Sequence, residues 1–415
     1  MNYREFLEKK IVLDSRMGFD VDPGEINSIL FSHQRDIVRW ALRGGRRAIF
    51  AAFGLGKTFM QLECLRIIGT REGGRQLIIA PLGVRQEFKQ DAAKLGIEIE
   101  FVRWSKDVSG PGTYITNYES VRDGRLDVNL FNAVSLDEAS CLRSYGSLTF
   151  QSFLTLFAGV KYRFVATATP SPNRFKELIH YAGFLGVMDT GQALTRFFQR
   201  DSQKANQLTL YPHKKKEFWL WVASWAIFLQ RPSDLGYSDE GYQLPPLQVH
   251  YHEVDAESSP VVDRDGQIQL FADASMSLKV AAKEKRESMD ERIDKMMEII
   301  GADPDSHFIL WHDQEAERHA IKKALPAAVE VYGSQDLELR EGRIIGFSNG
   351  DFQYLATKPI LSGSGCNFQR HCHKSIFLGI GFKFNDFIQS IHRIYRFLQS
   401  NECHIHIIYA KSERG

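Results

Sequence analysis

The chain has 415 residues, of which 43% are hydrophobic, so it is long enough for two or three domains with sizeable apolar cores. Its 52 basic and 51 acidic residues leave a formal net charge of +1, so bulk charge does not indicate a nucleic-acid partner, which would need a local basic surface. The five cysteines form no C-x-x-C pair and the N-terminus MNYREFLEKK lacks a signal-peptide core, which argues against a disulfide scaffold and predicts a soluble cytoplasmic protein.

Short apolar strands alternate with helical patterns from about residue 30 to residue 170, which predicts βαβ units and a parallel sheet. A helix is expected over 32–42, and it is expected to stop at the glycine pair Gly44 and Gly45. The strands expected in this half are 48–52, 76–80, 97–103, 113–117, 133–136 and 163–167. The same alternation returns near the C-terminus, with strands expected at 308–311, 354–357, 375–378 and 404–409.

The most apolar run, 218–229, is shorter than the roughly 20 residues that cross a bilayer, so we predict a buried helix there. Proline-rich breaks between 231 and 285 predict an irregular crossing between two α/β lobes. The expected organisation is an N-terminal accessory segment at 1–27, a first lobe with a helical extension at 28–230, a linker or insertion at 231–285, and a second lobe at 286–415.

The stretch AAFGLGKTF, which begins at Ala51, resembles a phosphate-binding loop whose first glycine is replaced by alanine. Gly54 and Gly56 allow a tight turn and a close approach of the backbone to phosphate. Lys57 supplies a cation, and Thr58 supplies a hydroxyl for Mg²⁺ and starts a helix whose N-terminal dipole favours anions. The strand before this loop and the helix after it favour nucleotide binding over an ordinary glycine-rich turn with an exposed lysine.

Two further groups of residues suit nucleotide hydrolysis. Asp137 and Glu138 follow a predicted strand, and we expect the first to hold Mg²⁺ and the second to orient and deprotonate the attacking water. Arg393 and Arg396 are three residues apart, so on a helix they would share one face, and arginine suits bidentate recognition of phosphate. The alternative for this pair is an amphipathic helix with two solvated arginines.

In this order the motifs resemble the ATPase core of superfamily-two helicases, most closely the Swi/Snf-type branch of double-strand DNA translocases. Gln34 resembles the glutamine that reads adenine, and Asp137 to Ser140 match the D-E-x-x box. Thr167 and Thr169 match motif III, whose hydroxyls couple hydrolysis to lobe movement. The looser matches are 77–83 to motif Ia, 115–119 to the next DNA-side motif, 308–312 to motif IV, 360–368 to motif V, and Gln389, Arg393, Arg396 and Gln399 to motif VI.

The resemblance implies two RecA-like lobes with ATP and Mg²⁺ between them, catalytic roles for Glu138, Arg393 and Arg396, and a nucleotide contact for Gln389. It also implies a DNA partner, preferably double-stranded, and bacterial and phage relatives are often joined to, or partnered with, a DNA methyltransferase or nuclease. Residues 171–285 match the family poorly, and the sequence ends where relatives usually continue with a helix. A strand-separating DNA or RNA helicase and an ATP-switched nucleic-acid-binding module with little turnover both stay open.

Overall fold

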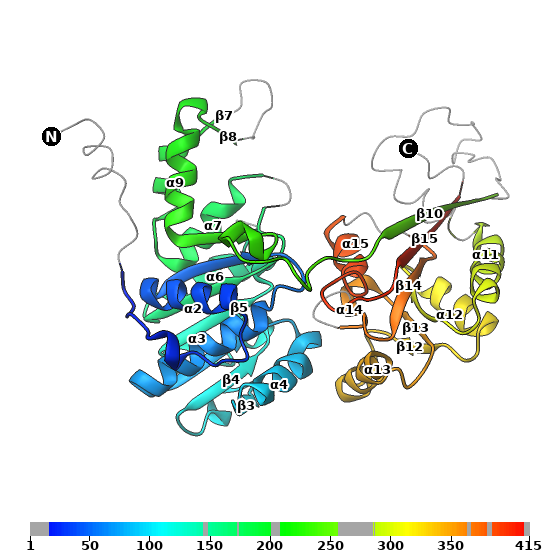
Figure 1. Cartoon of the computed structure of the whole chain (residues 1–415), viewed down its shortest axis with the longest axis horizontal. Coiled ribbons are helices and arrows are strands. Elements are labelled where there is room, and N and C mark those ends of the chain that lie inside the picture. The colour runs from blue at the N-terminus through cyan, green and yellow to red at the C-terminus, as the bar shows by residue number, and fades with distance from the viewer. Residues whose placement is uncertain are drawn as a thin grey trace, which may run out of the picture. The chain divides into compact units, whose positions relative to one another are not determined.

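A computed structural model describes residues 16–143, 148–171, 174–200, 208–255, 285, 287–362, 367–379 and 384–410 (Figure 1). The chain divides into two compact units, Met1–Tyr242 and Gln243–Gly415, each with its own sheet. Most of the predicted linker and four residues of the motif V match, 363–366, lie outside the described residues.

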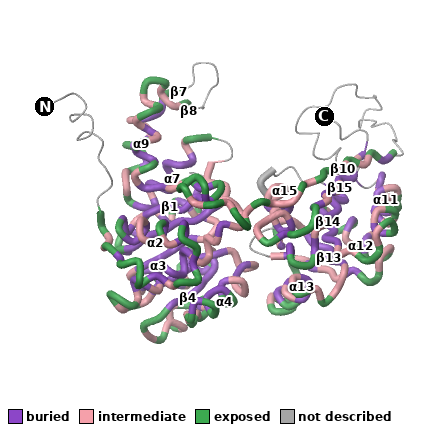
Figure 2. Tube along the Cα trace, in the orientation of Figure 1, coloured by how far each residue is buried: buried purple, intermediate pink, exposed green. Residues whose placement is uncertain are grey.

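The first unit is built on a seven-stranded sheet of order β3-β4-β2-β5-β6-β1-β9, and every strand pair in it is parallel. Its strands are β1 Arg46–Ala51, β2 Arg75–Ile79, β3 Ile99–Phe101, β4 Gly112–Thr116, β5 Ala133–Asp137, β6 Tyr162–Ala166 and β9 Ala226–Leu229. The six strands expected from the sequence in this half are therefore confirmed. Apart from β3, whose residues are partly or fully exposed, their apolar character fits strands buried within the sheet, and the tube view colours them largely as buried (Figure 2).

Helices cover both faces of this sheet because parallel strands need crossover connections. One core lies under α2 Ser32–Gly44, α3 Lys57–Glu72 and α4 Arg85–Lys94. The other lies under α5 Tyr118–Arg122, α6 Leu148–Leu156, α7 Glu177–Leu185, α8 Thr190–Phe197 and α9 Lys215–Trp225. A small antiparallel pair, β7 Phe198–Arg200 and β8 Leu208–Leu210, connects α8 to α9. The single-turn 3₁₀ segments are η1 Pro23–Glu25, η2 Leu82–Val84, η3 Ser105–Asp107, η4 Val128–Leu130, η5 Ala139–Arg143, η6 Pro212–Lys214 and η7 Pro232–Leu235.

The prediction of one buried helix over 218–229 is wrong for its last four residues. Helix α9 ends at Trp225, and the chain continues as the edge strand β9, which pairs in parallel with β1 from Ala226 opposite Ala48 to Leu229 opposite Ala51. A continuous apolar run carries no periodicity that separates a buried helix from a buried strand, so the sequence offered no boundary.

The second unit is a six-stranded parallel sheet of order β10-β15-β14-β11-β13-β12. Its strands are β10 Leu247–Val254, β11 His307–Trp311, β12 Val329–Val331, β13 Tyr354–Thr357, β14 Cys372–Phe377 and β15 Cys403–Ala410. Its helices are α11 Met289–Ala302, α12 Glu315–Ala324, α13 Leu337–Asn349, α14 Pro359–Ser362 and α15 Phe384–Ile391. Two apolar cores, one on each face, complete a second α/β layer structure, so the predicted fold class of two largely parallel lobes is confirmed.

Strand β10 lies inside the segment predicted as a linker. It pairs with β15 over its whole length, from Leu247 opposite Cys403 to Val254 opposite Ala410. The chain therefore enters the second sheet at Leu247. The sequence of β10, LQVHYHEV, is too polar to be recognised as a continuous apolar strand.

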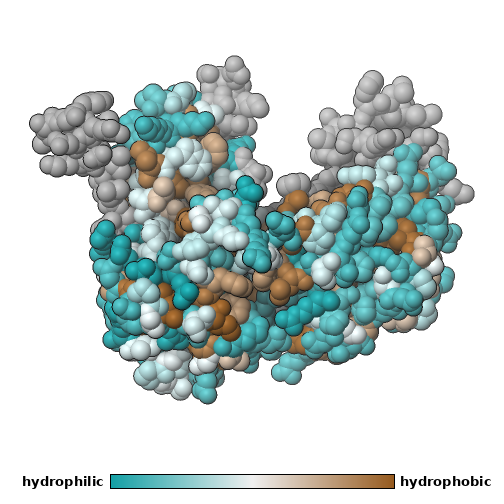
Figure 3. Space-filling view, viewed as in Figure 1, coloured by the Kyte–Doolittle hydropathy of each residue, from teal (hydrophilic) through white to brown (hydrophobic). Residues whose placement is uncertain are grey.

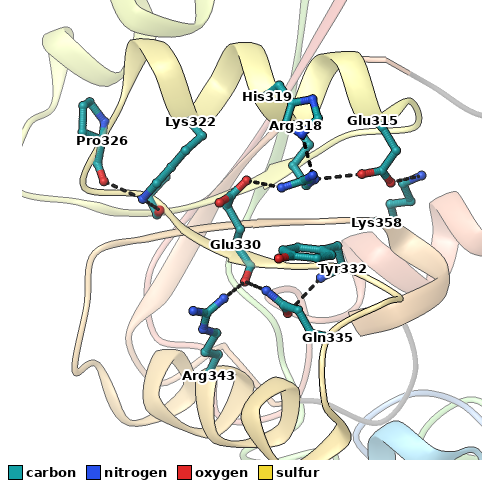
Figure 4. Close-up of polar contacts among 11 residues, drawn as sticks. Glu315, Arg318, His319, Lys322, Pro326, Glu330, Tyr332, Gln335, Arg343 and Lys358 are labelled. Atoms are coloured by element: carbon teal, nitrogen blue, oxygen red, sulfur yellow. Dashed lines mark hydrogen bonds and ion pairs between the residues drawn. The ribbon is translucent and has the colours of Figure 1, made fainter.

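A charged network fixes the ends of β12 and β13 in the second unit (Figure 4). On α12, Arg318 bonds Glu315 at 2.8 Å and Glu330 at 2.6 Å, and its guanidinium lies 4.2 Å from the ring centre of Tyr332. Lys358, which follows β13, bonds the same Glu315 at 2.7 Å. The hydrogen bond from Lys358, followed by that from Arg318, lowers the pKa of Glu315 to about 2, so this carboxylate stays ionised and holds α12 to the residue before α14.

The face drawn in Figure 3 is mostly hydrophilic, with hydrophobic groups among polar ones. Within the described ranges, no helix has the length and apolar content that crossing a bilayer requires.

Candidate nucleotide-binding site

The loop between β1 and α3 has the backbone that a phosphate-binding loop needs. Gly54 and Gly56 have φ angles of 84° and 76°, in the left-handed region that residues with a side chain rarely adopt. Helix α3 begins at Lys57, whose Nζ folds back to donate to the carbonyls of Ala51 at 2.9 Å and Ala52 at 3.2 Å. The predicted strand–loop–helix arrangement is confirmed, and the lysine ammonium lies over the loop.

Gln34, near the start of α2, lies directly against this loop. Its Oε1 accepts from the Phe31 N–H at 3.0 Å, and its Nε2 donates to the Leu55 carbonyl at 3.1 Å. A Cβ added to Gly56 would come within 2.3 Å of the same Nε2, so glycine at this position is needed for the close packing. The structure thus brings the predicted adenine-reading residue and the predicted phosphate loop together.

Asp137 is the last residue of β5, and α3 holds its carboxylate in place. Gln61 donates to Asp137 Oδ1 at 2.8 Å and accepts from the Ser135 hydroxyl at 2.7 Å. Burial raises the pKa of Asp137 to about 6, although the Gln61 hydrogen bond and the Lys57 charge act in the opposite direction. The helix that presents Lys57 and Thr58 at its first turn is therefore tied to the predicted metal carboxylate.

Glu138 adopts a φ angle of 47°, which is unusual for a residue other than glycine. Its Oε1 accepts from the Thr167 hydroxyl at 3.1 Å, and the Thr167 Oγ1 accepts in turn from the Thr169 N–H at 3.1 Å. Backbone strain of this kind costs on the order of 1–3 kcal/mol and concentrates at functional sites. The predicted base and the two predicted coupling threonines therefore form one chain of contacts between the ends of β5 and β6.

Sequence reasoning missed three residues that support this site: Gln61, Ser135 and Tyr118, whose hydroxyl donates to the Asp137 carbonyl at 2.7 Å. Gln61 lies four residues after Lys57, which places both on one face of α3, and this spacing was the available signal. The contacts of Ser135 and Tyr118 depend on tertiary packing, so no local pattern announced them.

In the second unit, Arg393 and Arg396 do not share a helix face, as they would if one helix carried both. Helix α15 ends at Ile391, and both arginines follow it in irregular turns. The Arg393 guanidinium is buried and its Nε donates to the Gln389 carbonyl at 3.2 Å, whereas Arg396 is partly exposed. Gln389 and Arg393 are thus in contact, but through a side chain-to-backbone bond across the helix end.

Gln399, the last motif VI position, fixes these turns against the sheet. Its Nε2 donates to the carbonyls of Ile394 at 3.0 Å and Cys372 at 3.1 Å, and Cys372 is the first residue of β14. The N–H of Phe368 donates to the Arg393 carbonyl at 3.1 Å. Hydrogen bonds to backbone carbonyls therefore hold the segment that carries both arginines, and Arg396 lies in a turn of that segment.

The first unit fits a nucleotide with a magnesium ion. Mg²⁺ in phosphate-binding sites is typically held by one or two protein oxygen ligands together with substrate phosphates. Thr58 and Asp137 offer a hydroxyl and a carboxylate of this kind, and the Gln61 bridge ties the helix of one to the strand of the other. Nucleotide phosphates and water would take the remaining positions of an octahedral ion.

No protein-family model matches this chain, and a search of curated proteins returned no match. Among solved structures, the chain is similar to the SWI2/SNF2 ATPase core of Sulfolobus solfataricus, which was solved in complex with double-stranded DNA. The two share 16% sequence identity with a TM-score of 0.48, and the alignment covers 94% of this chain and 90% of the other.

Proposed function

We propose that the chain is a nucleic-acid-stimulated ATPase that uses ATP to move along DNA, preferably double-stranded DNA. The observation that supports this proposal best is the assembly in the first unit of a left-handed glycine loop, the Gln34 amide and the Asp137–Glu138 pair. These groups lie at the carboxyl ends of β1 and β5, which is where parallel α/β sheets bind their ligands.

The chemistry follows from the side chains. The loop N–H groups and Lys57 would bind the β and γ phosphates, and Gln34 would select the base. Mg²⁺, held by Thr58 and Asp137, neutralises phosphate charge when bound. Glu138 would take a proton from water as the water oxygen attacks the γ phosphorus and the bond to the β-bridging oxygen breaks, which gives ADP and phosphate.

The second unit would contribute Arg393 and Arg396 to the same nucleotide. Arginine stabilises the charge that spreads over the transferred phosphoryl group, and one such residue contributes on the order of 10³–10⁵ in rate. Because the γ phosphate would contact both units, hydrolysis would remove the link between them. If both units bind the DNA backbone, one cycle of closing and opening would shift the protein along it.

The test is the steady-state ATPase rate of the purified chain without nucleic acid, then with single-stranded DNA, duplex DNA and RNA in turn. The proposal predicts low basal turnover and a strong increase with duplex DNA, which high salt suppresses because backbone binding is electrostatic. Preferential stimulation by single-stranded DNA or RNA would instead favour a strand-separating helicase. Absence of turnover with every nucleic acid would leave an ATP-switched binding module and overturn the motor.

A further inference from the structure

Four histidines line one face of the strand pair that begins the second sheet. His250 and His252 lie on β10, and His404 and His406 lie on β15. Figure 1 shows these two strands side by side. Residues two apart on a strand point to the same side, and His250 lies directly opposite His406 in the register. The parallel pairing therefore gathers all four imidazoles, which we call the histidine quartet.

The quartet is held together by two ring-to-ring hydrogen bonds. The Nε2 atom of His250 lies 3.0 Å from Nδ1 of His404, and the Nε2 atom of His252 lies 3.0 Å from Nδ1 of His406. The central rings, His250 and His406, stack with their centroids 4.7 Å apart and their planes 17° apart. Each bond needs one ring nitrogen that donates and one that accepts, so each bridge accommodates at most one added proton.

Few other side-chain contacts hold β10 in the sheet. It is an edge strand whose only partner in the described sheet is β15, and Val254 is its only buried side chain. Gln248, Val249, Tyr251 and Glu253 are all exposed. Cross-strand side-chain pairs are the main side-chain contribution to sheet stability, so the two histidine bridges are a large share of what holds this strand beyond its backbone bonds.

The surroundings of the quartet do not supply a clear excess of negative charge. Helix α11 packs on these two strands and presents Lys295 and Glu298, which form an ion pair with each other. From β14, Lys374 acts on His404 and His406 and is paired with Asp303. The remaining charged or titratable groups that act on the quartet or its neighbours, among the described residues, are Glu402, which favours the charged form of His404, and His373 and His307.

These surroundings disfavour imidazolium. Burial lowers the pKa of His252 and of His404, and neighbouring cations and imidazoles act in the same direction. Burial together with the other three rings lowers the pKa of His406 to about 3. The paired strands therefore bind fewer protons than the separated strands would.

We propose that the histidine quartet holds β10 to β15 in a proton-sensitive way and releases β10 when the pH falls. In the separated state His252, His404 and His406 would titrate near the ordinary histidine pKa of about 6.5. Because the paired state binds fewer protons, pairing is at full strength above that pH and weakens as the pH falls below it. This inference does not depend on ATP hydrolysis.

The release would lengthen the connection between the two units. The first unit ends at Tyr242 and β10 begins at Leu247, so β10 is the first element of the second unit. Eight extended residues span about 26 Å, and all eight would join the connecting segment once β10 left the sheet. Acidification would therefore loosen the tether through which any relative movement of the units is transmitted.

The test is hydrogen exchange of the full chain at pH 7.5, 6.5 and 5.5, with each rate divided by the intrinsic rate at that pH. Protection of peptides over 247–254 should fall about tenfold per pH unit below about 6.5 for each proton taken up on release. Peptides over the central strand β11 should keep their protection. Uniform protection of β10 across this range would overturn the proposal.

Variants separate the quartet from general acid sensitivity. The double variant His250→Gln/His252→Gln keeps hydrogen-bonding capacity but removes two imidazoles, and it should lose most of the pH dependence of β10. The variant His404→Gln/His406→Gln should do the same from the other strand, so one misfolded variant does not decide the result. His213→Gln, at an exposed site in the first unit, is the matched control and should behave as wild type. A wild-type pH dependence in both double variants would contradict the inference.

Discussion

At the scale of single residues, Glu138 and its strained backbone are the most specific sign of chemistry. Its left-handed φ angle and its contact with Thr167 hold the carboxylate just beyond the end of β5, next to Asp137, in the sheet whose strand β1 leads into the loop. Structural requirements of the sheet do not explain a left-handed glutamate directly after a strand. The role that we propose for Glu138, orienting and deprotonating water, would account for this conformation.

Replacing Glu138 by glutamine should reduce ATP turnover by at least about 10²-fold, the scale of a lost general base. ATP binding should persist, because the loop, Lys57 and Gln34 are untouched. Turnover can be measured by phosphate release and binding by a fluorescent ATP analogue. Glu100→Gln, on the exposed edge strand β3, is the control and should match wild type. Wild-type turnover by the Glu138 variant would show that the base lies elsewhere.

The buried charge of Asp137 has a cost that a stability measurement can detect. Its pKa is raised from an ordinary value near 3.8 to about 6, so folding is favoured when the group is protonated, and this contribution is lost as the pH rises through 6. Asp137→Asn should therefore stabilise the nucleotide-free protein at pH 7 by up to about 3 kcal/mol, while it abolishes turnover.

The free energy of unfolding from urea titrations at pH 5 and pH 7 checks this prediction. The stabilisation by Asp137→Asn should be present at pH 7 and should shrink at pH 5, where the wild-type carboxyl is largely protonated. Asp305→Asn, at an exposed position, should change stability by little at either pH. Equal destabilisation by Asp137→Asn at both pH values would contradict the assigned protonation.

At the scale of elements, the end of α2 depends on a glycine. Gly45 caps this helix with a φ angle of 73°, and a Cβ there would lie 2.9 Å from the Gly18 nitrogen and 3.0 Å from the Met17 carbonyl carbon. Gly45→Ala should therefore destabilise the protein by about 1–3 kcal/mol, which is measured as a lower thermal unfolding temperature. Gly342→Ala on α13 meets nothing within 4 Å and should be neutral or stabilising by up to about 1 kcal/mol. Equal effects of the two substitutions would refute the argument from backbone conformation.

Elements were predictable from the sequence where a pattern was strong and local. Strands such as β2 and β5 are short apolar runs bounded by breaks, and they were found. Strand β9 was missed because it continues the apolar run of α9. Strand β10 was missed because only Leu247, Val249 and Val254 in it are aliphatic and it lies in a segment expected to be irregular. The three-residue spacing of Arg393 and Arg396 cannot show that α15 ends at Ile391, before both of them.

The candidate site shows the same difference between features that a local pattern predicts and features that it does not. The loop and the Asp137–Glu138 pair were identifiable because their chemistry is concentrated in a few consecutive residues. The Gln61 bridge to Ser135 and Asp137 joins positions more than 70 residues apart, so it depends on how α3 packs on β5. Packing of that kind is a property of the assembled sheet, which no local spacing encodes.

At the scale of the whole molecule, the proposed motor needs two separately folded units to act on one nucleotide. The first unit holds the phosphate loop, Gln34 and the two carboxylates. The second holds Arg393 and Arg396 on a segment anchored by Gln399. A motor in which hydrolysis changes the relation between units needs both sets, whereas a nucleotide-binding switch would need only the first.

The most direct test compares ATP binding with duplex-DNA-stimulated turnover for Arg396→Ala, a partly exposed residue whose loss leaves the core intact. We expect an ATP affinity within a few-fold of wild type and a DNA-stimulated ATP turnover reduced by on the order of 10³-fold. Arg370→Ala, an exposed arginine of the same unit, should leave both quantities unchanged. Wild-type turnover by Arg396→Ala would contradict the claim that the second unit completes the catalytic site.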